Sequence, residues 1–384
     1  VGEPIAIVIA QNRYIAEDAL ELIDVQYEEL VSVISISDAI KSDAPVLHEK
    51  VNSNIVSARN FNYGNVEKAF SEAKHIVEID IKYPRNSCTP IECFNIIAEY
   101  SLEENSYNVM SNFQGPFALH PVMAMALNIS GNKLRLRSPE NSGGSFGVKQ
   151  AVFSYIVALC LASKKVGKPL KWVEDRLEHL LAATSATGRE SKLQAAVLEN
   201  GELIGLKITQ FDDCGGYLRA PEPASLYRMH GNLSGAYKVK NISLTNNVVL
   251  TNKTPSGLNR GFGGPQFYYG LERLMQKIAK VLQKPHLEII KTNLLNSDMF
   301  PYRTPSGGVL DSGNYKKAIE KAEVEGKLEE LFKKRKKKKL EGKLYGIGFT
   351  AVVEPSISNM GYISTALTHD ERLKAGPKNG AHAC

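Results

Sequence analysis

Alternation of apolar and polar residues predicts β-strands in the first third of the chain. KHIVEIDIKY (residues 74–83) alternates with the two-residue period of a half-buried strand. FNIIAEYSL (94–102) and NSYNVMSNF (105–113) are typical of the next two strands, and KLRLRS (133–138) of a shorter one. We therefore expect four strands between residues 74 and 138.

The start of the chain predicts the order strand, helix, strand. IAIVIA (5–10) and LVSVIS (30–35) are the expected strands, and apolar residues at helical spacing run from Ala16 to Ile23. Residues 37–54 are polar and without periodicity, which indicates an exposed linker. We therefore expect a first domain at residues 1–50.

Longer apolar periods predict helices further along the chain. They cover residues 116–129, 149–167 and 266–283, the last with one apolar face. KLQAAVLENGELIGLKITQF (192–211) predicts a hairpin in which Asn200-Gly201 forms a type I′ turn. Strands and helices alternate throughout, so we predict the α+β fold class. The main domain is expected at 60–325 and a third unit at 343–384.

Composition excludes a membrane protein and gives little support to nucleic-acid binding. The longest apolar runs are too short to span a bilayer. Much of the net charge of +6 comes from seven adjacent cations at 333–339. Aromatic stacking residues and a helix-turn-helix pattern do not accompany them, which favours a solvated helix end. Nucleic-acid binding by this run stays the weaker alternative.

The five cysteines show neither a CxxC pair nor zinc-finger spacing with histidines. Cys160 lies in an apolar helix and is expected to be a small buried residue. This usage indicates a reducing cytoplasm without structural disulfides. We expect no metal held by the protein's own side chains, so any redox centre must be supplied by a cofactor.

A glycine loop between a strand and a helix is the first candidate site. Ser142-Gly143-Gly144-Ser145-Phe146-Gly147 would let the backbone approach a ligand closely. The following helix would offer unpaired N–H groups to an anion. A tight structural turn explains the same residues equally well.

Three further segments carry candidate chemistry. Arg260 and Phe262 lie in a loop rich in glycine and proline (254–266), which suits binding of an oxyanion beside an aromatic wall, or a plain surface loop. Gln114, at a strand-to-helix junction, could donate an amide hydrogen bond to a metal-oxo group without adding charge. Glu92 is interpreted as a structural carboxylate that holds its loop, with a functional role as the alternative.

Taken in order and spacing, these segments resemble the large subunit of the molybdenum hydroxylases, the xanthine dehydrogenase and aldehyde oxidase family. The resemblance spans nearly the whole chain. Its blocks are VGEPIAIVIA, PIECFNIIAEY, NFQGPF, GGSFGVK, KPLKWVEDRLEHLLAATSATGRE, TNKTPSGLNRGFGGPQFYYGLER and PYRTPSGGVLDSGNY. It implies a partial α/β hammerhead domain at 1–50, the first molybdenum-cofactor-binding domain at 60–325 and the truncated start of a second at 343–384.

The resemblance also assigns roles to single residues. The residues implied to bind the cofactor are Gln114, Gly143, Gly144, Phe146, Gly147, Arg260 and Gly261. Those implied to meet the substrate are Phe262, Gln150 and Arg228. Gln150 stands where the purine-oxidising branch has a glutamate, and Gly261 where carbon monoxide dehydrogenases have a copper-binding cysteine. Both substrates are therefore disfavoured, and an aldehyde, glyceraldehyde-like, is expected.

The implied cofactor is molybdenum-molybdopterin, expected as the cytosine dinucleotide. In the family the pterin's sulfurs hold the metal, so the protein needs only donors and a shaped pocket. The resemblance further implies a heterotrimer, with FAD on a medium subunit and [2Fe–2S] clusters on a small subunit.

The family's catalytic glutamate lies in a G-x-G-E-x-P motif near the C-terminus. VGEP at residues 1–4 looks similar but matches the N-terminal domain by position, and nothing after Glu354-Pro355 fits. We therefore expect no catalytic residue in this chain. An inactive fragment that only binds or assembles is the alternative to an active enzyme subunit.

Overall fold

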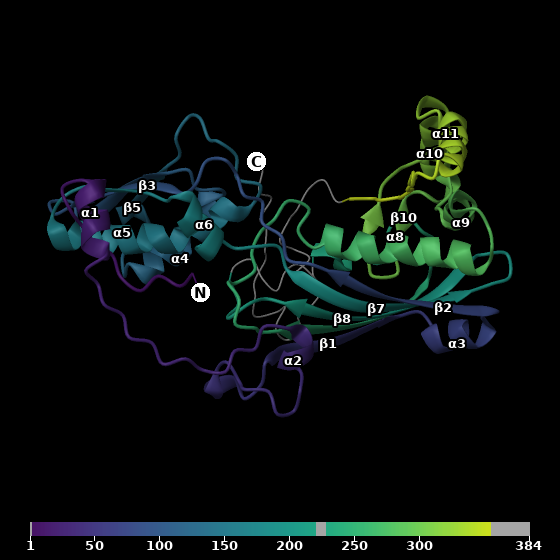
Figure 1. The fold of residues 1–384 in the computed structure, drawn as a ribbon, viewed down its shortest axis with the longest axis horizontal. Coiled ribbons are helices and arrows are strands. Elements are labelled where there is room, and N and C mark those ends of the chain that lie inside the picture. The colour runs from purple at the N-terminus through teal and green to yellow at the C-terminus, as the bar shows by residue number, and fades with distance from the viewer. Residues whose placement is uncertain (1, 220–227, 355–384) are drawn as a thin grey trace.

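The computed structural model describes residues 2–219 and 228–354. Figure 1 shows two lobes along the long axis of the molecule, each built around its own β-sheet. The predicted α+β class is confirmed. Residues 220–227 and 355–384, which include most of the expected third unit, lie outside the described part of the chain.

The first lobe is built on a four-stranded sheet in the order β5-β4-β3-β6. β3 pairs antiparallel with β4 and β6, whereas β4 and β5 are parallel. α4 and α5 cover the sheet and share an apolar core with it. The elements are β3 (Asn95–Ser101), β4 (Ser106–Ser111), α4 (Pro116–Ala126), η2 (Gly131–Lys133), β5 (Leu134–Arg137), η3 (Val148–Val152), α5 (Phe153–Val166), β6 (Leu170–Val173) and α6 (Arg176–Ala182).

The second lobe is built on a five-stranded sheet in the order β1-β9-β8-β7-β2. Figure 1 shows the long helix α8 on one face and α3 on the other. The elements of this sheet and its covering helices are β1 (Ile55–Tyr63), α3 (Val66–Glu72), β2 (His75–Tyr83), β7 (Gly188–Val197), β8 (Leu203–Asp213), β9 (Asn241–Val249), α8 (Gly264–Val281) and α9 (His286–Asn293).

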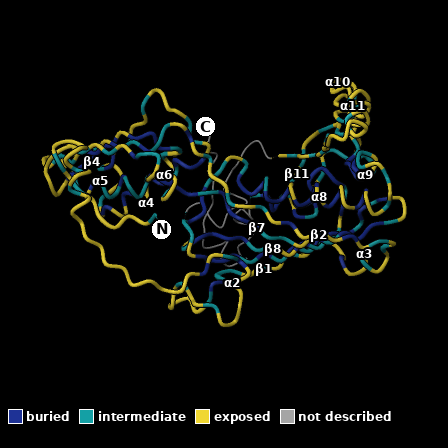
Figure 2. The backbone as a smooth tube through the Cα atoms, in the orientation of Figure 1, coloured by how far each residue is buried: buried dark blue, intermediate teal, exposed yellow. Residues whose placement is uncertain are grey.

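The apolar face of α8 explains why this helix lies on the sheet. Leu271, Leu274, Met275 and Ile278 are fully buried against residues of β2, β7 and β8. Burying each such side chain contributes about 1.5–3 kcal/mol to folding. Figure 2 shows buried backbone running through both sheets and exposed backbone at the outer helices. Each lobe is thus stabilised by its own apolar core. The loops between the two lobes are the place where a site can form.

The two strands predicted near the N-terminus are wrong. Residues 5–10 and 30–35 form no strand, although the helix between them is present as α1 (Arg13–Leu20). Ile5 and Ile7 are exposed, and Val33 bonds the backbone of Asn252 and not a neighbouring strand. An alternating segment without a pairing partner does not form a stable strand. Two short elements follow, namely α2 (Ile36–Ala39) and η1 (Glu49–Val51).

The other predicted strands and helices are confirmed, but the hairpin turn differs from the prediction. The amide of Gly201 donates to the carbonyl of Leu198 at 2.9 Å, and only Gly201 has a positive φ, of 93°. A type I′ turn would need positive φ at Asn200 as well. The chain instead uses a longer loop that ends in a left-handed glycine.

The lysine run lies in a helix that stands out from the second lobe. The last elements are η4 (Ser297–Met299), β10 (Tyr302–Arg303), β11 (Val309–Leu310), α10 (Tyr315–Glu325) and α11 (Leu328–Leu340). α11 carries the lysines and buries none of its residues, so the predicted solvated helix is confirmed. Among the described residues, no helix is both long enough and apolar enough to cross a bilayer.

Candidate cofactor site

The two predicted glycine loops meet between the lobes. Residues 142–147 follow β5 of the first lobe, and residues 254–263 connect β9 to α8 of the second. The amide of Arg260 donates to the carbonyl of Phe146 at 2.8 Å. Segments far apart in the sequence therefore form one continuous backbone surface.

Glycine is required where the two loops touch. Gly147 has a φ of 115°, and a Cβ atom there would lie 2.5 Å from the carbonyl oxygen of Leu258. Gly144 and Gly261 both have a φ of 87°, which other residues rarely adopt. Phe146 itself has a φ of 54°, a conformation that costs energy in a residue with a side chain. The loops are thus held in a shape that places bare backbone at the surface.

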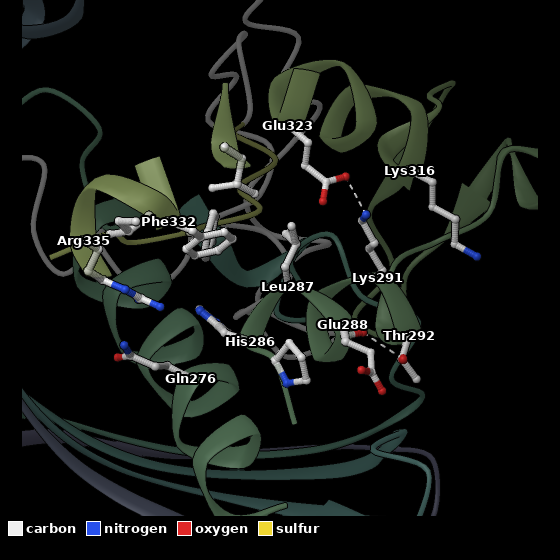
Figure 3. Close-up of a pocket in the computed structure, with 14 residues that line it drawn as sticks. Gln276, His286, Leu287, Glu288, Lys291, Thr292, Lys316, Glu323, Phe332 and Arg335 are labelled. Carbon is white, nitrogen blue, oxygen red and sulfur yellow. Dashed lines mark hydrogen bonds and ion pairs between the residues drawn. The ribbon is translucent and has the colours of Figure 1, made fainter. Parts of the chain in front are cut away.

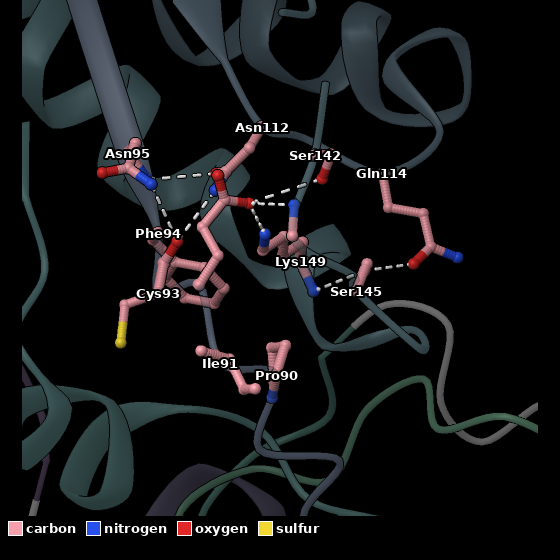
Figure 4. A network of polar contacts seen from close by, with 12 residues as sticks. Pro90, Ile91, Cys93, Phe94, Asn95, Asn112, Gln114, Ser142, Ser145 and Lys149 are labelled. Atoms are coloured by element: carbon pink, nitrogen blue, oxygen red, sulfur yellow. Dashed lines mark hydrogen bonds and ion pairs between the residues drawn. The ribbon is translucent and has the colours of Figure 1, made fainter. Parts of the chain in front are cut away.

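Gln114 is oriented by the first loop. Its Oε1 accepts hydrogen bonds from the Gly147 amide at 2.9 Å and from the Ser145 hydroxyl. Because Oε1 accepts both of these hydrogen bonds, the NH₂ group of the same side chain faces away from the loop. Figure 4 shows the Gln114 nitrogen directed outward from the polar network. The predicted donor therefore makes no hydrogen bond within the described part of the chain.

Cys88 is a residue of this site that sequence reasoning missed. Its Sγ lies 3.2 Å from the carbonyl oxygen of Phe146 and 3.0 Å from Oδ1 of Asn259, and the single S–H can donate to either acceptor. It thereby links both glycine loops. Burial raises the pKa of the Cys88 thiol, which keeps the sulfur protonated and able to donate. Its place in the PRNSCTP segment gave no local signal, because both partners lie far away in the sequence.

Glu92 holds the start of the first loop. Its carboxylate accepts hydrogen bonds from the Gly143 amide at 3.0 Å and from the fully buried ammonium of Lys149. Burial opposes ionisation of Glu92, but the bonds from Lys149, Asn112 and Gly143 outweigh it and lower the pKa of the carboxyl. The structural interpretation of Glu92 is confirmed.

The exposed side of the junction carries an arginine and an aromatic ring. The guanidinium of Arg260 lies 5.3 Å from the centre of the Phe146 ring, and both side chains are exposed. This distance allows a cation–π contact. Phe262 is buried, with 7% of its surface exposed, so it supports the loop from behind more than it faces solvent.

Arg228 and Gln150, the two other residues expected to meet the substrate, also lie next to these loops. Arg228 donates to the carbonyl of Gly261 at 2.6 Å and to the carboxylate of Glu354 at 2.7 Å. Gln150 lies in η3, directly after the first loop, and its Oε1 is buried without a hydrogen-bond partner among the described residues. An unpaired buried acceptor is costly, so it marks a place where a ligand donor would be favourable.

These groups fit the cofactor that the resemblance implies. The exposed guanidinium of Arg260 suits an anionic group. A Cβ atom at position 144, 147 or 261 would meet other atoms of the protein, so glycine at these positions lets the loops fold closely. The amide of Gln114 can donate to an oxygen without adding charge. The predicted site residues are thus brought together, while their binding roles stay predictions.

A separate cavity of about 840 Å³ lies in the second lobe. Figure 3 shows it between α8, α9 and α11, with Phe332 and Arg335 on one side and the Lys291–Glu323 ion pair on the other. None of the predicted site residues lines it. It is therefore distinct from the junction of the glycine loops.

Comparison with known proteins gives the family. Residues 47–294 match the molybdopterin cofactor-binding domain. The chain is 31% identical to the carbon monoxide dehydrogenase large chain of Hydrogenophaga pseudoflava, over 83% of this chain and 42% of that protein. It is 28% identical to the nicotine 6-hydroxylase large subunit of Paenarthrobacter nicotinovorans, over 96% of this chain and 46% of that protein. The chain spans less than half the length of both relatives.

Solved structures agree with this assignment. Quinoline 2-oxidoreductase from Pseudomonas putida 86 matches with a TM-score of 0.81 and 28% identity, over 87% of this chain and 42% of that one. Aldehyde oxidoreductase from Desulfovibrio gigas matches with a TM-score of 0.77 over 85% of this chain and 35% of that one, and at 22% identity it shows likeness of fold alone. The chain belongs to the molybdopterin cofactor-binding family and, within it, to the large subunits of the molybdenum hydroxylases.

Proposed function

We propose that this chain forms the cofactor-holding part of a molybdopterin-dependent oxidoreductase that oxidises an aldehyde to its carboxylic acid with oxygen from water. A glyceraldehyde-like substrate is favoured. The observation that carries the proposal is the junction of the two loops, where Arg260 bonds Phe146 and Gln114 bonds Gly147. The junction thereby brings a neutral amide, that of Gln114, and a cation, that of Arg260, onto the two joined loops.

Each group of this surface has a separate task. When bound, the molybdenum cofactor supplies a two-electron acceptor for oxidation of the substrate. Gln114 would donate from its NH₂ group to an oxygen of the bound cofactor. Arg260 would bind the cofactor's anionic portion, and Gly147 lets the two loops pack against each other. Cys88 and Glu92 hold the loops in place and act through the backbone.

Two positions support an aldehyde over other substrates. Gln150 provides a neutral amide where the purine-oxidising branch has a glutamate, so it offers no carboxylate to a purine ring. Gly261 has no thiol to bind copper. By their names, the relatives reported above act on carbon monoxide, nicotine and quinoline. Because nicotine and quinoline are N-heterocyclic compounds, such compounds form the competing substrate class.

We further propose that the complete protein works in the cytoplasm with partner subunits. The relatives' names, large chain and large subunit, support an assembly of unequal chains. In this assembly a medium subunit holds FAD and a small subunit holds [2Fe–2S] clusters, which carry the electrons away. The cofactor is expected in its cytosine dinucleotide form.

The test uses the complete polypeptide that contains this chain, purified with its partners. Molybdenum is measured by mass spectrometry, and dye reduction is followed with glyceraldehyde, xanthine, nicotine and carbon monoxide. We expect stoichiometric molybdenum and turnover with the aldehyde at least about tenfold above the others. Molybdenum without aldehyde turnover would overturn the substrate class alone, whereas absence of molybdenum would overturn the whole proposal.

A further inference from the structure

We propose that Cys93, Glu174 and His179 form a binding site for a zinc-like divalent metal ion, separate from the cofactor site. One sulfur, oxygen or nitrogen ligand atom from each of these side chains lies within 4.8 Å of the others. Glu174 and His179 are buried, and Cys93 is partly exposed. A metal ion can therefore reach the cluster from the Cys93 side.

The sheet of the first lobe brings the three residues together. Cys93 lies two residues before Asn95, the first residue of β3, and Glu174 directly follows β6. Because β3 and β6 are antiparallel, with Asn95 opposite Val173, these two ends meet. His179 is placed by α6, which starts at a capping box formed by Asp175 and Glu178. Spacing along the sequence could not reveal this cluster.

The imidazole of His179 faces Glu174. Its Nδ1 lies 2.7 Å from Oε2 of Glu174, which also accepts the Phe94 amide at 2.9 Å. An ion held by His179 and Glu174 together would take the place of the proton between Nδ1 and Oε2, so Nδ1 is the ligand atom of the imidazole. Nε2 then keeps its own proton and is buried without a hydrogen-bond partner in the described part of the chain. His179 has 0% of its surface exposed.

The donor set selects the kind of metal. Thiolate, imidazole and carboxylate together suit Zn²⁺, whereas Mg²⁺ and Ca²⁺ prefer oxygen ligands alone. Three protein ligands leave a fourth position for water. On binding, the Cys93 thiol releases its proton to solvent, and the thiolate and Glu174 then balance the two positive charges of the ion. Both Arg176 and Asp175 act electrostatically on Cys93. The positive charge of Arg176 opposes binding of the ion, whereas the negative charge of Asp175 favours it.

The site lies beside the cofactor loops without sharing their residues. Figure 4 shows the Cys93 sulfur directed away from Ser142 and Lys149. Cys93 is the neighbour of Glu92, which holds Gly143. A metal at Cys93 would thus fix the backbone on which the first glycine loop depends. The inference does not require the proposed function.

The experiment measures metal binding by the full chain after treatment with a chelator. Equilibrium dialysis against Zn²⁺ gives the stoichiometry and affinity, and Co²⁺ serves as the optical probe. We expect one tight Zn²⁺ per chain and a near-ultraviolet band from a thiolate–cobalt bond. Cys93→Ser should abolish the band and weaken Zn²⁺ binding by more than about 100-fold, and His179→Gln should weaken it similarly.

Cys88→Ser is the matched control, because Cys88 is also partly exposed but lies outside the cluster. It should leave both signals unchanged. The inference is overturned if Cys93→Ser keeps the cobalt band, or if Zn²⁺ binds equally to the wild type and Cys93→Ser. Circular dichroism monitors folding, and if His179→Gln does not fold, the partly exposed Cys93 decides the matter alone.

Discussion

The amide of Arg260 donates to the carbonyl of Phe146 at 2.8 Å, while its guanidinium lies 5.3 Å from the centre of the Phe146 ring. The two residues therefore contact each other through both backbone and side chain. Each belongs to a different lobe, so this pair fixes how the two glycine loops face each other. The geometry of the candidate site follows from it.

Gly147→Ala tests the close approach of the loops. The new Cβ would lie 2.5 Å from the Leu258 carbonyl oxygen at a φ of 115°. We expect the free energy of unfolding to fall by about 3 kcal/mol and molybdenum content to drop. Gly167→Ala is the control, because Gly167 also has a positive φ but nothing lies within 4 Å of its Cβ position. It should cost about 1 kcal/mol in chemical denaturation. Equal losses in the two variants would refute the steric explanation.

Cys88 is expected to act through its S–H, which can donate to Phe146 or to Asn259. Cys88→Ala removes the donor to Phe146 and Asn259 and should lower the free energy of unfolding by about 1 kcal/mol. Cys88→Ser keeps a donor and should lie within about 0.5 kcal/mol of the wild type. Molybdenum retained after gel filtration should follow the same order. A serine variant as poor as the alanine variant would contradict this role.

The buried Lys149 should depend on Glu92 for its charge balance. Glu92→Gln leaves the ammonium unpaired at a position with 0% exposure. We expect a loss of about 3 kcal/mol in urea unfolding. Lys149→Leu combined with Glu92→Gln should recover most of this loss, because no buried charge then remains. Strictly additive effects in this double-mutant cycle would show that the two groups do not interact.

His230 should make stability depend on pH. Burial lowers its pKa from 6.5 to about 4, and the Tyr63 hydroxyl contacts its Nε2 atom. As the pH falls from 6.5 to 4, His230 becomes protonated in the unfolded chain but stays neutral in the folded chain. Folding should therefore lose up to about 3 kcal/mol across this window. His230→Gln should flatten the profile, whereas the exposed His48→Gln should not. Identical pH profiles for wild type and His230→Gln would rule the explanation out.

Local patterns predicted much of the fold but could not identify strand partners. Residues 74–83 alternate and form β2, because β7 pairs with them and α8 covers one face. Residues 5–10 are as apolar but form no strand in the structure. The difference lies in long-range pairing, which periodicity does not contain. The hairpin turn after β7 was missed for a different reason, since Asn200-Gly201 permits more than one turn type.

The parts of the candidate site that consist of an unusual, glycine-rich local sequence could be predicted. Two glycines beside Phe146 and the glycines around Arg260 are such signals. Cys88 gave none, because its partners Phe146 and Asn259 reach it only through the fold. The cluster of Cys93, Glu174 and His179 was hidden in the same way, since it needs the pairing of β3 with β6.

The central claim is that Gln114 and the two joined loops hold a molybdenum cofactor. The most direct measurement is the molybdenum content of the complete protein, purified with its partners, for the wild type, Gln114→Ala and the exposed-helix control Gln276→Ala. The account predicts stoichiometric molybdenum in the wild type and the control, and a loss of at least about tenfold in Gln114→Ala. Equal molybdenum in all three proteins, or none in the wild type, would contradict it.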